Sequence, residues 1–250
     1  MIGFFRKIRR KLSNENKFIQ YSRYAIGEIL LVVIGILIAL QINTTVKWNQ
    51  NRKLEIEYLN VFNYELEEDI IFYKDLIESL ISQQKSLRNV IEVIENPQEV
   101  ILDSLRFIND YRKGSGGENL DRSSVTWKEL QSTGQISLIQ NKNLIRKFFE
   151  YYDFSERFAT DFNRFPLEQR LILREIEHGL FNLNEHDEYF KNWQHDQTPR
   201  KEVFEFVRTN KELLYHLKSV LISSKVQSEI GEEVLVLAEE ILDSIKMKTK

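Results

Sequence analysis

The chain has 250 residues, of which 29% are charged, and a mean hydropathy of −0.39. These values argue against a membrane protein built of many spans and are typical of a water-exposed domain. The absence of cysteine excludes a disulfide framework, a thiolate metal site and a lipid-modified cysteine anchor. Only nine glycines and three prolines are present, so helix breakers are scarce and an all-α fold is predicted.

The net charge of −3 hides an asymmetry along the chain. Residues 1–23 carry seven basic side chains and one acidic one, a charge of +6, so the remainder carries −9. The apolar residues of this segment recur every three or four positions. That pattern fits a basic amphipathic helix on an anionic membrane surface, or a plain topogenic charge cluster. Both interpretations make residues 1–23 a cytoplasmic segment, and the acidic remainder disfavours nucleic-acid binding.

A transmembrane helix is predicted over residues 24–44. Its core, Ala25 to Ile42, has only Glu28 and Gln41 as strongly polar residues. Eighteen helical residues span about 27 Å, close to the hydrocarbon thickness of a bilayer. No small-x-small cleavage site follows, so an uncleaved anchor is favoured over a signal peptide. Seven basic residues precede the span and three follow it, which places residues 45–250 outside the cytoplasm.

Four positions in the span are candidates for helix association or partner contact. Gly35 and Ala39 form a small-x-x-x-small pair, with Gly27 two turns earlier, which would let a second helix approach closely. Glu28 lies one turn inside the cytoplasmic edge, where a carboxylate is costly unless it reaches the headgroups or pairs with another group. The simpler interpretation is that the Glu28 carboxylate reaches the lipid headgroups. The alternative is that Glu28 contacts a partner or is a protonatable group.

The residues of the opening also resemble those of a known family. Phe4 to Arg9, Glu15 to Phe18 and Tyr24 to Asn43 look like the start of an uncharacterised bacterial family of single-span membrane proteins with a domain of unknown function. The stretch from Trp127 to Asn141, with Tyr151 and Tyr152 after it, resembles a second segment of that family. The resemblance implies the membrane topology and, from Gram-negative hosts, an inner-membrane protein with a periplasmic domain. It implies no activity.

The segment after the span has helical periodicity without a breaker from Leu54 to Pro97. Its apolar stripe is wide, as in a helix that packs in a bundle, and only Asp69 and Gln83 interrupt the seam. No breaker separates Gln41 from Leu54, so we expect the transmembrane helix to continue into this one. The seven-residue repeat consists of Leu59, Leu66, Tyr73, Leu80, Leu87 and Ile94.

A second long helix is predicted from Lys211 to Met247. One of its rows consists of small residues at Ser224, Gly231 and Ala238, which would allow close antiparallel approach of the Leu54–Pro97 segment. Shorter helices are expected between the two. The signals that bound them are a flexible loop at Gly114–Gly117, a stop at Gly134, an N-cap at Asn141, a kink or restart at Pro166, and a start at Thr198–Pro199. The predicted fold is an elongated antiparallel helical bundle.

Three histidines, His178, His186 and His195, raise the question of a metal site. Glu175 and His178 have the Glu-x-x-His spacing of carboxylate-bridged di-iron bundles. That chemistry needs a second such pair, and the sequence has none, so surface or satisfied histidines are the default and no metal or other cofactor is expected. The many other carboxylates are interpreted as solvated helix faces.

No serine–histidine–acid arrangement, nucleophile elbow or nucleotide-binding loop is present in the sequence. We therefore predict a non-enzymatic, membrane-anchored interaction or scaffold module that contacts the lipid bilayer and either a second copy of itself or another envelope protein. The alternatives are a ligand-sensing domain or a proton-coupled auxiliary subunit of a membrane complex, the latter depending on Glu28.

Overall fold

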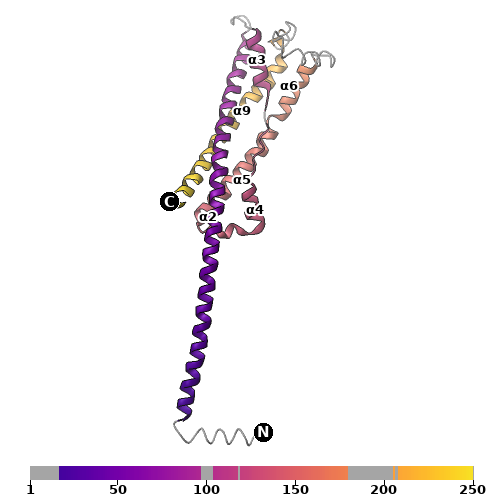
Figure 1. The fold of residues 1–250 in the computed structure, drawn as a ribbon. Coiled ribbons are helices and arrows are strands. Elements are labelled where there is room, and N and C mark those ends of the chain that lie inside the picture. The colour runs from indigo at the N-terminus through magenta and orange to yellow at the C-terminus, as the bar shows by residue number, and fades with distance from the viewer. Residues whose placement is uncertain (1–16, 97–103, 118, 180–204, 206–207, 250) are drawn as a thin grey trace, which may run out of the picture. The chain divides into compact units, whose positions relative to one another are not determined.

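The computed structural model describes residues 17–96, 104–117, 119–179, 205 and 208–249 (Figure 1). These residues are helical with no strand, which confirms the predicted all-α class. The elements are α2 (Lys17–Glu95), α3 (Ser104–Ser115), α4 (Val125–Thr133), the 3-10 helix η1 (Gln135–Leu138), α5 (Lys142–Arg164), α6 (Leu167–Gly179) and α9 (Lys211–Thr249). The predicted amphipathic segment before Lys17 and the predicted start at Thr198–Pro199 lie outside the described residues.

The chain divides into two compact units, Met1–Ile56 and Glu57–Lys250. In the first unit, α2 contains an apolar window of mean hydropathy 2.6 with none of its surface buried, long and apolar enough to cross a membrane. Helix α2 continues past this window without a break to Glu95, as predicted from the lack of a breaker. The hydroxyls of Thr44 and Thr45 donate to the carbonyls of Leu40 and Gln41, one turn earlier in the helix.

In the second unit, α9 runs antiparallel to the domain part of α2 (Figure 1). Three ion pairs mark the register: Glu67 with Lys246, Lys74 with Glu239, and Glu95 with Lys218. Because these pairs are half-exposed, each contributes at most about 1 kcal/mol, and the apolar seam between them is the main stabilising contact. Leu59, Leu66, Tyr73, Leu80 and Leu87 of the predicted repeat are all buried there.

The small-residue row of α9 allows α2 to approach closely, as predicted. Ser224 and Ala238 are fully buried, and the Ser224 hydroxyl donates to the Leu80 carbonyl at 3.3 Å. A Cβ at Gly231 would lie 3.3 Å from Cγ1 of Ile77 and 3.9 Å from the Phe158 ring. Glycine is therefore fitted to this contact by its size, since its helical backbone does not need a left-handed conformation.

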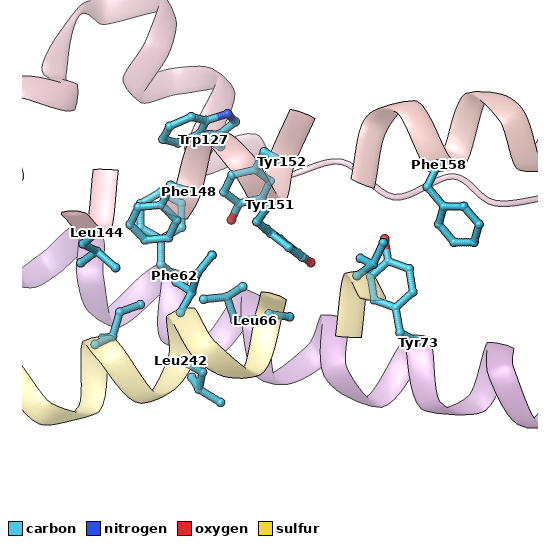
Figure 2. Close-up of a cluster of buried hydrophobic side chains, with 14 of the residues drawn as sticks. Phe62, Leu66, Tyr73, Trp127, Leu144, Phe148, Tyr151, Tyr152, Phe158 and Leu242 are labelled. Carbon is cyan, nitrogen blue, oxygen red and sulfur yellow. The ribbon is translucent and has the colours of Figure 1, made fainter. Parts of the chain in front are cut away.

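A cluster of aromatic rings joins α2 to α4 and α5 (Figure 2). The Phe62 and Phe148 rings are 4.4 Å apart, and the rings of Trp127 and Tyr152 stack 5.1 Å apart. Every one of these side chains is buried, so the cluster supplies much of the hydrophobic stabilisation of this end of the unit. A second cluster, around Leu87, packs α2 against α3, α6 and α9.

Buried glutamines hold backbone carbonyls where helices meet. Gln84 donates to the Ser224 carbonyl and the Ser228 hydroxyl, and Gln227 donates to the carbonyls of Phe162 and Phe165. A buried amide needs such partners, because an unpaired one costs about 1–3 kcal/mol. These contacts fix the register between helices in a way that apolar packing alone does not.

The prediction of a flexible loop at Gly114–Gly117 is wrong at its start, because α3 extends to Ser115. The Gln83 side chain, which interrupts the predicted apolar seam, holds this segment. Its amide donates to the carbonyls of Gly114 at 3.0 Å and Gly116 at 2.7 Å. Helix α3 continues through Gly114 to Ser115, and a Cβ at Gly114 would lie 2.8 Å from the Leu87 side chain. Gly114 is thus a close-packing glycine within a helix, and the helix ends later than predicted.

The predicted helix ends otherwise agree with the structure. The Asn141 side chain accepts hydrogen bonds from the first turn of α5, and Gly134 ends α4 with φ of 70°. That left-handed conformation favours glycine, so the stop has a backbone reason. Pro166 separates α5 from α6, and the Asn210 side chain caps α9.

Replacing Gly231 by leucine should lower the free energy of unfolding by about 1–3 kcal/mol, because the added carbons overpack the α2–α9 seam. Lys225→Leu, at an exposed position of the same helix, is the matched control and should change stability little. Thermal and urea unfolding followed by circular dichroism would measure both variants. Equal stability of the two variants would contradict the close approach at Gly231.

Candidate functional site

The four candidate positions in the span all lie on the exposed surface of α2. No atom of the chain lies within 4 Å of where a Cβ would stand at Gly27 or Gly35, so this face is open to another helix. Ala39 and Glu28 are exposed as well. The structure places these residues along one apolar helix and brings no other part of the described chain against them, so their roles stay predictions.

An open groove lies between α5 and α9, with a volume of about 910 Å³. Its apolar lining consists of Phe154 on α5 and Val236 and Leu237 on α9. Val236 is 52% exposed, whereas Phe154 and Leu237 are half-buried. We call this surface the α5–α9 groove. The rest of its lining is charged: Glu150, Asp153, Arg157, Glu229, Glu232 and Glu233.

Helical geometry explains how these residues come together. Glu150, Asp153, Phe154 and Arg157 are three or four positions apart, so they share one face of α5. The opposite face of α5 carries the buried residues of the aromatic cluster, which hold the helix in place. The α5–α9 register is set by the ion pair of Lys147 with Glu240 at one end and by the buried Gln227 contacts at the other.

Only some of the charged side chains of the α5–α9 groove form ion pairs with described residues. Arg157 lies 3.0 Å from the Asp153 carboxylate, and its guanidinium is 5.9 Å from the centre of the Phe154 ring. The remaining acidic side chains, Glu150, Glu229, Glu232 and Glu233, make no ion pair with any described residue. By contrast, Glu239 and Glu240, farther along α9, both have lysine partners.

A partly buried polar network lies on the other side of α5. Asp69 of α2 accepts a hydrogen bond from Arg122 Nε at 2.9 Å and one from the Tyr151 hydroxyl at 2.7 Å. Glu65 accepts from the hydroxyls of Ser124 and Thr126 at 2.6 and 2.5 Å. Asp69, which interrupted the apolar seam of the sequence, thus tethers two other elements to α2.

Two small cavities, of about 150 and 260 Å³, lie beside this network. Both are lined by Arg122, Ser124, Tyr152 and Ser155. The Tyr152 hydroxyl is buried next to Ser124 without a hydrogen bond of good geometry to a described residue. A cavity of this size with an unpartnered hydroxyl suits a water molecule or a small polar ligand.

Burial raises the pKa of the Tyr73, Tyr151 and Tyr152 hydroxyls far above the usual value for tyrosine. The negative charge of Asp69 raises the pKa of Tyr73 and Tyr151 further. All three phenols therefore stay protonated in the folded domain at neutral pH, as hydrogen-bond donors rather than bases.

The comparisons with known proteins are consistent with the sequence resemblance. Residues 28–113 match DUF6090, a family of unknown function. This match covers about a third of the chain and ends in α3, so it does not include α5 or α9. No curated protein and no solved structure matches the chain.

The histidines do not form a described site. His186 and His195 lie outside the described residues, and so does the side chain of His178, although its backbone belongs to α6. Glu175 is exposed on the same helix. Within the described part of the chain, no group of three histidine or acidic side chains is placed to hold a metal ion.

Sequence reasoning missed the α5–α9 groove, because its carboxylates had the spacing of an ordinary solvated face. Glu229, Glu232 and Glu233 occur together with Val236 on the exposed side of α9. An apolar residue on the same face as a run of unpaired acids is the one signal that the sequence offered. The facing residues of α5 are about 80 positions earlier, so only the fold brings the two halves together.

We expect the domain to lose stability as the pH rises beyond about 10, where tyrosines of the unfolded chain ionise. A raised pKa in the folded state gives a stabilisation that is complete below the unfolded value and is lost above it. Circular dichroism and tyrosinate absorbance, recorded together, should show a cooperative absorbance step as helix is lost. Ionisation of all ten tyrosines with the helical signal intact would contradict this expectation.

Proposed function

We propose that the chain is a membrane-anchored helical interaction module that binds another envelope protein or a second copy of itself. The observation that carries this proposal is the α5–α9 groove, where Val236 is 52% exposed beside the half-buried Phe154 and Leu237 and charged side chains complete the lining. Accessible apolar surface rimmed by polar residues is typical of protein-binding sites. The role is binding, without a catalytic step or a cofactor.

The anchor and its orientation complete the proposal. Residues 24–44 would hold the chain in the inner membrane, with residues 1–23 in the cytoplasm and residues 45–250 in the periplasm. The positive-inside rule supports this orientation, since seven basic residues precede the span and three follow it. The exposed apolar window of α2 supports the anchor itself.

The interaction is testable by placing the photo-reactive amino acid p-benzoylphenylalanine at position 236 in living cells. Illumination should yield a discrete product, identified by mass spectrometry as either a second copy or another envelope protein. The control is the same amino acid at position 222, where Ile222 is similarly exposed on α9 but outside the groove. No product from position 236, or the same products from both positions, would overturn the proposal.

Self-association through the span is the second part of the proposed role. The open face at Gly35 and Ala39 would let two helices approach closely. Leucine at both positions should weaken dimerisation in mild detergent about tenfold, the equivalent of about 1.4 kcal/mol, as measured by sedimentation equilibrium. Val33→Leu, on the opposite face, is the control. A chain that is monomeric, or a dimer unaffected by the leucines, would contradict association through this face.

Two alternative roles come from the sequence. The cavity beside Tyr152, with its unpartnered hydroxyl, is the observation that favours a ligand-sensing domain. A proton-coupled auxiliary subunit depends on Glu28, which is exposed on the span. Identification of the cross-linked protein separates these roles, because a signalling protein and a proton-translocating complex are different partners.

A further inference from the structure

We propose that the α5–α9 groove receives a basic amphipathic helix of a partner protein on the outer side of the membrane. This inference rests on the proposed function and adds the chemistry of the partner. Three properties of the groove support it: its apolar lining, the sign of its charge, and its position between two antiparallel helices.

The apolar lining provides the contact surface. Val236 and Leu237 of α9 face Phe154 of α5, and the Arg157 guanidinium lies over the Phe154 ring. Since Asp153 already pairs with Arg157, these two side chains neutralise each other at the α5 wall. An aromatic and two aliphatic side chains can accept the apolar stripe of a short helix.

The charge of the groove selects the partner. Glu150 on one wall and Glu229, Glu232 and Glu233 on the other have no cationic partner among the described residues. Neighbouring acids outside the groove, Glu239 and Glu240, are paired with lysines. Acids without an ion pair thus line the same groove as accessible apolar side chains, and such a field attracts cations and repels anions.

The groove is long enough for a short helix. The lining of α9 runs from Glu229 to Leu237, a rise of about 12 Å, which matches two to three turns of a docked helix. A helix in a groove presents apolar anchors at positions i, i+3 or i+4, and i+7. Lysine and arginine on its flanks can lie along the walls and reach the carboxylates with their long side chains.

The chain's own basic segment, residues 1–23, has this chemistry but lies across the membrane in the proposed topology. A partner protein of the outer compartment is therefore the occupant to which we commit. Nucleic acids and anionic lipid surfaces carry the same sign of charge as the groove, so they fit it poorly.

The first test repeats the cross-linking from position 236 in a chain carrying Glu229→Gln, Glu232→Gln and Glu233→Gln. The matched control carries Glu239→Gln and Glu240→Gln, which removes the paired acids of the same helix. We expect the triple variant to lower the yield of product at least fivefold and the control to change it less than twofold. The cross-linked peptide of the partner should contain lysine or arginine around an apolar stripe.

The outcomes separate the two proposals. An undiminished product in the triple variant, or a cross-link to an acidic or neutral segment, overturns the basic helix and leaves the interaction module standing. A cross-link to residues 1–23 overturns the outer partner together with the topology. No discrete product from the unaltered chain overturns the interaction module itself.

A second measurement does not depend on the variants folding. The full chain in phosphatidylcholine nanodiscs is titrated with a fluorescent synthetic helix bearing an apolar stripe and flanking lysines. A twin peptide with glutamate in place of every lysine is the control. We expect binding of the basic peptide alone, weakened about tenfold by a rise in salt from low to physiological concentration, because the contact is largely electrostatic. Equal binding of the two peptides overturns the inference.

Discussion

The close packing of α2 against α9 is the contact on which the rest of the domain depends. A row of small residues with Gly231 at its centre lets the two helices approach until a Cβ at that position would lie only 3.3 Å from Cγ1 of Ile77. That approach buries the apolar rows of both helices, which is the main favourable term available to a bundle of this size. The buried Gln84 then fixes the register, because its amide has partners in only one alignment of the helices. The shorter helices α3, α5 and α6 pack onto this pair.

Much of the fold could be predicted from the sequence, because its determinants are local or periodic. The heptad rows, the Asn141 cap and the Gly134 stop each follow from neighbouring residues, and the structure contains all of them. Asp69 and Gln83 could be seen only as exceptions to the apolar seam. Their partners are 31 to 82 positions away, so their tethering roles become visible only in three dimensions. The α5–α9 groove could not be predicted for the same reason. Periodicity shows that the acids of a helix are exposed, but it does not show which face of another helix lies beside them.

Along α2 the environment changes while the secondary structure does not. Within the span the side chains are apolar around the whole circumference and exposed, as in a helix whose solvent is lipid. From Leu59 onward most of the apolar residues form one stripe that is buried by protein, and Val61, Ile71 and Ile81 stay exposed outside it. The segment that matches DUF6090 begins at Glu28, so it includes most of the exposed apolar window and the buried stripe that follows it. Of the surfaces proposed for binding, the span positions Gly35 and Ala39 lie within that match, whereas the α5–α9 groove lies after it.

The unpaired acids of the groove also have a consequence for the free domain. Glu229 and Glu233 are one turn apart on α9, and like charges at this spacing destabilise a helix by about 0.2–0.5 kcal/mol. Lysine at either position would relieve the repulsion, as Lys74 and Lys147 do for the acids farther along the helix. The domain is thus less stable alone than its own composition allows. Such a compromise between stability and activity is common at functional surfaces, and here the ligand itself would supply the missing counter-charge.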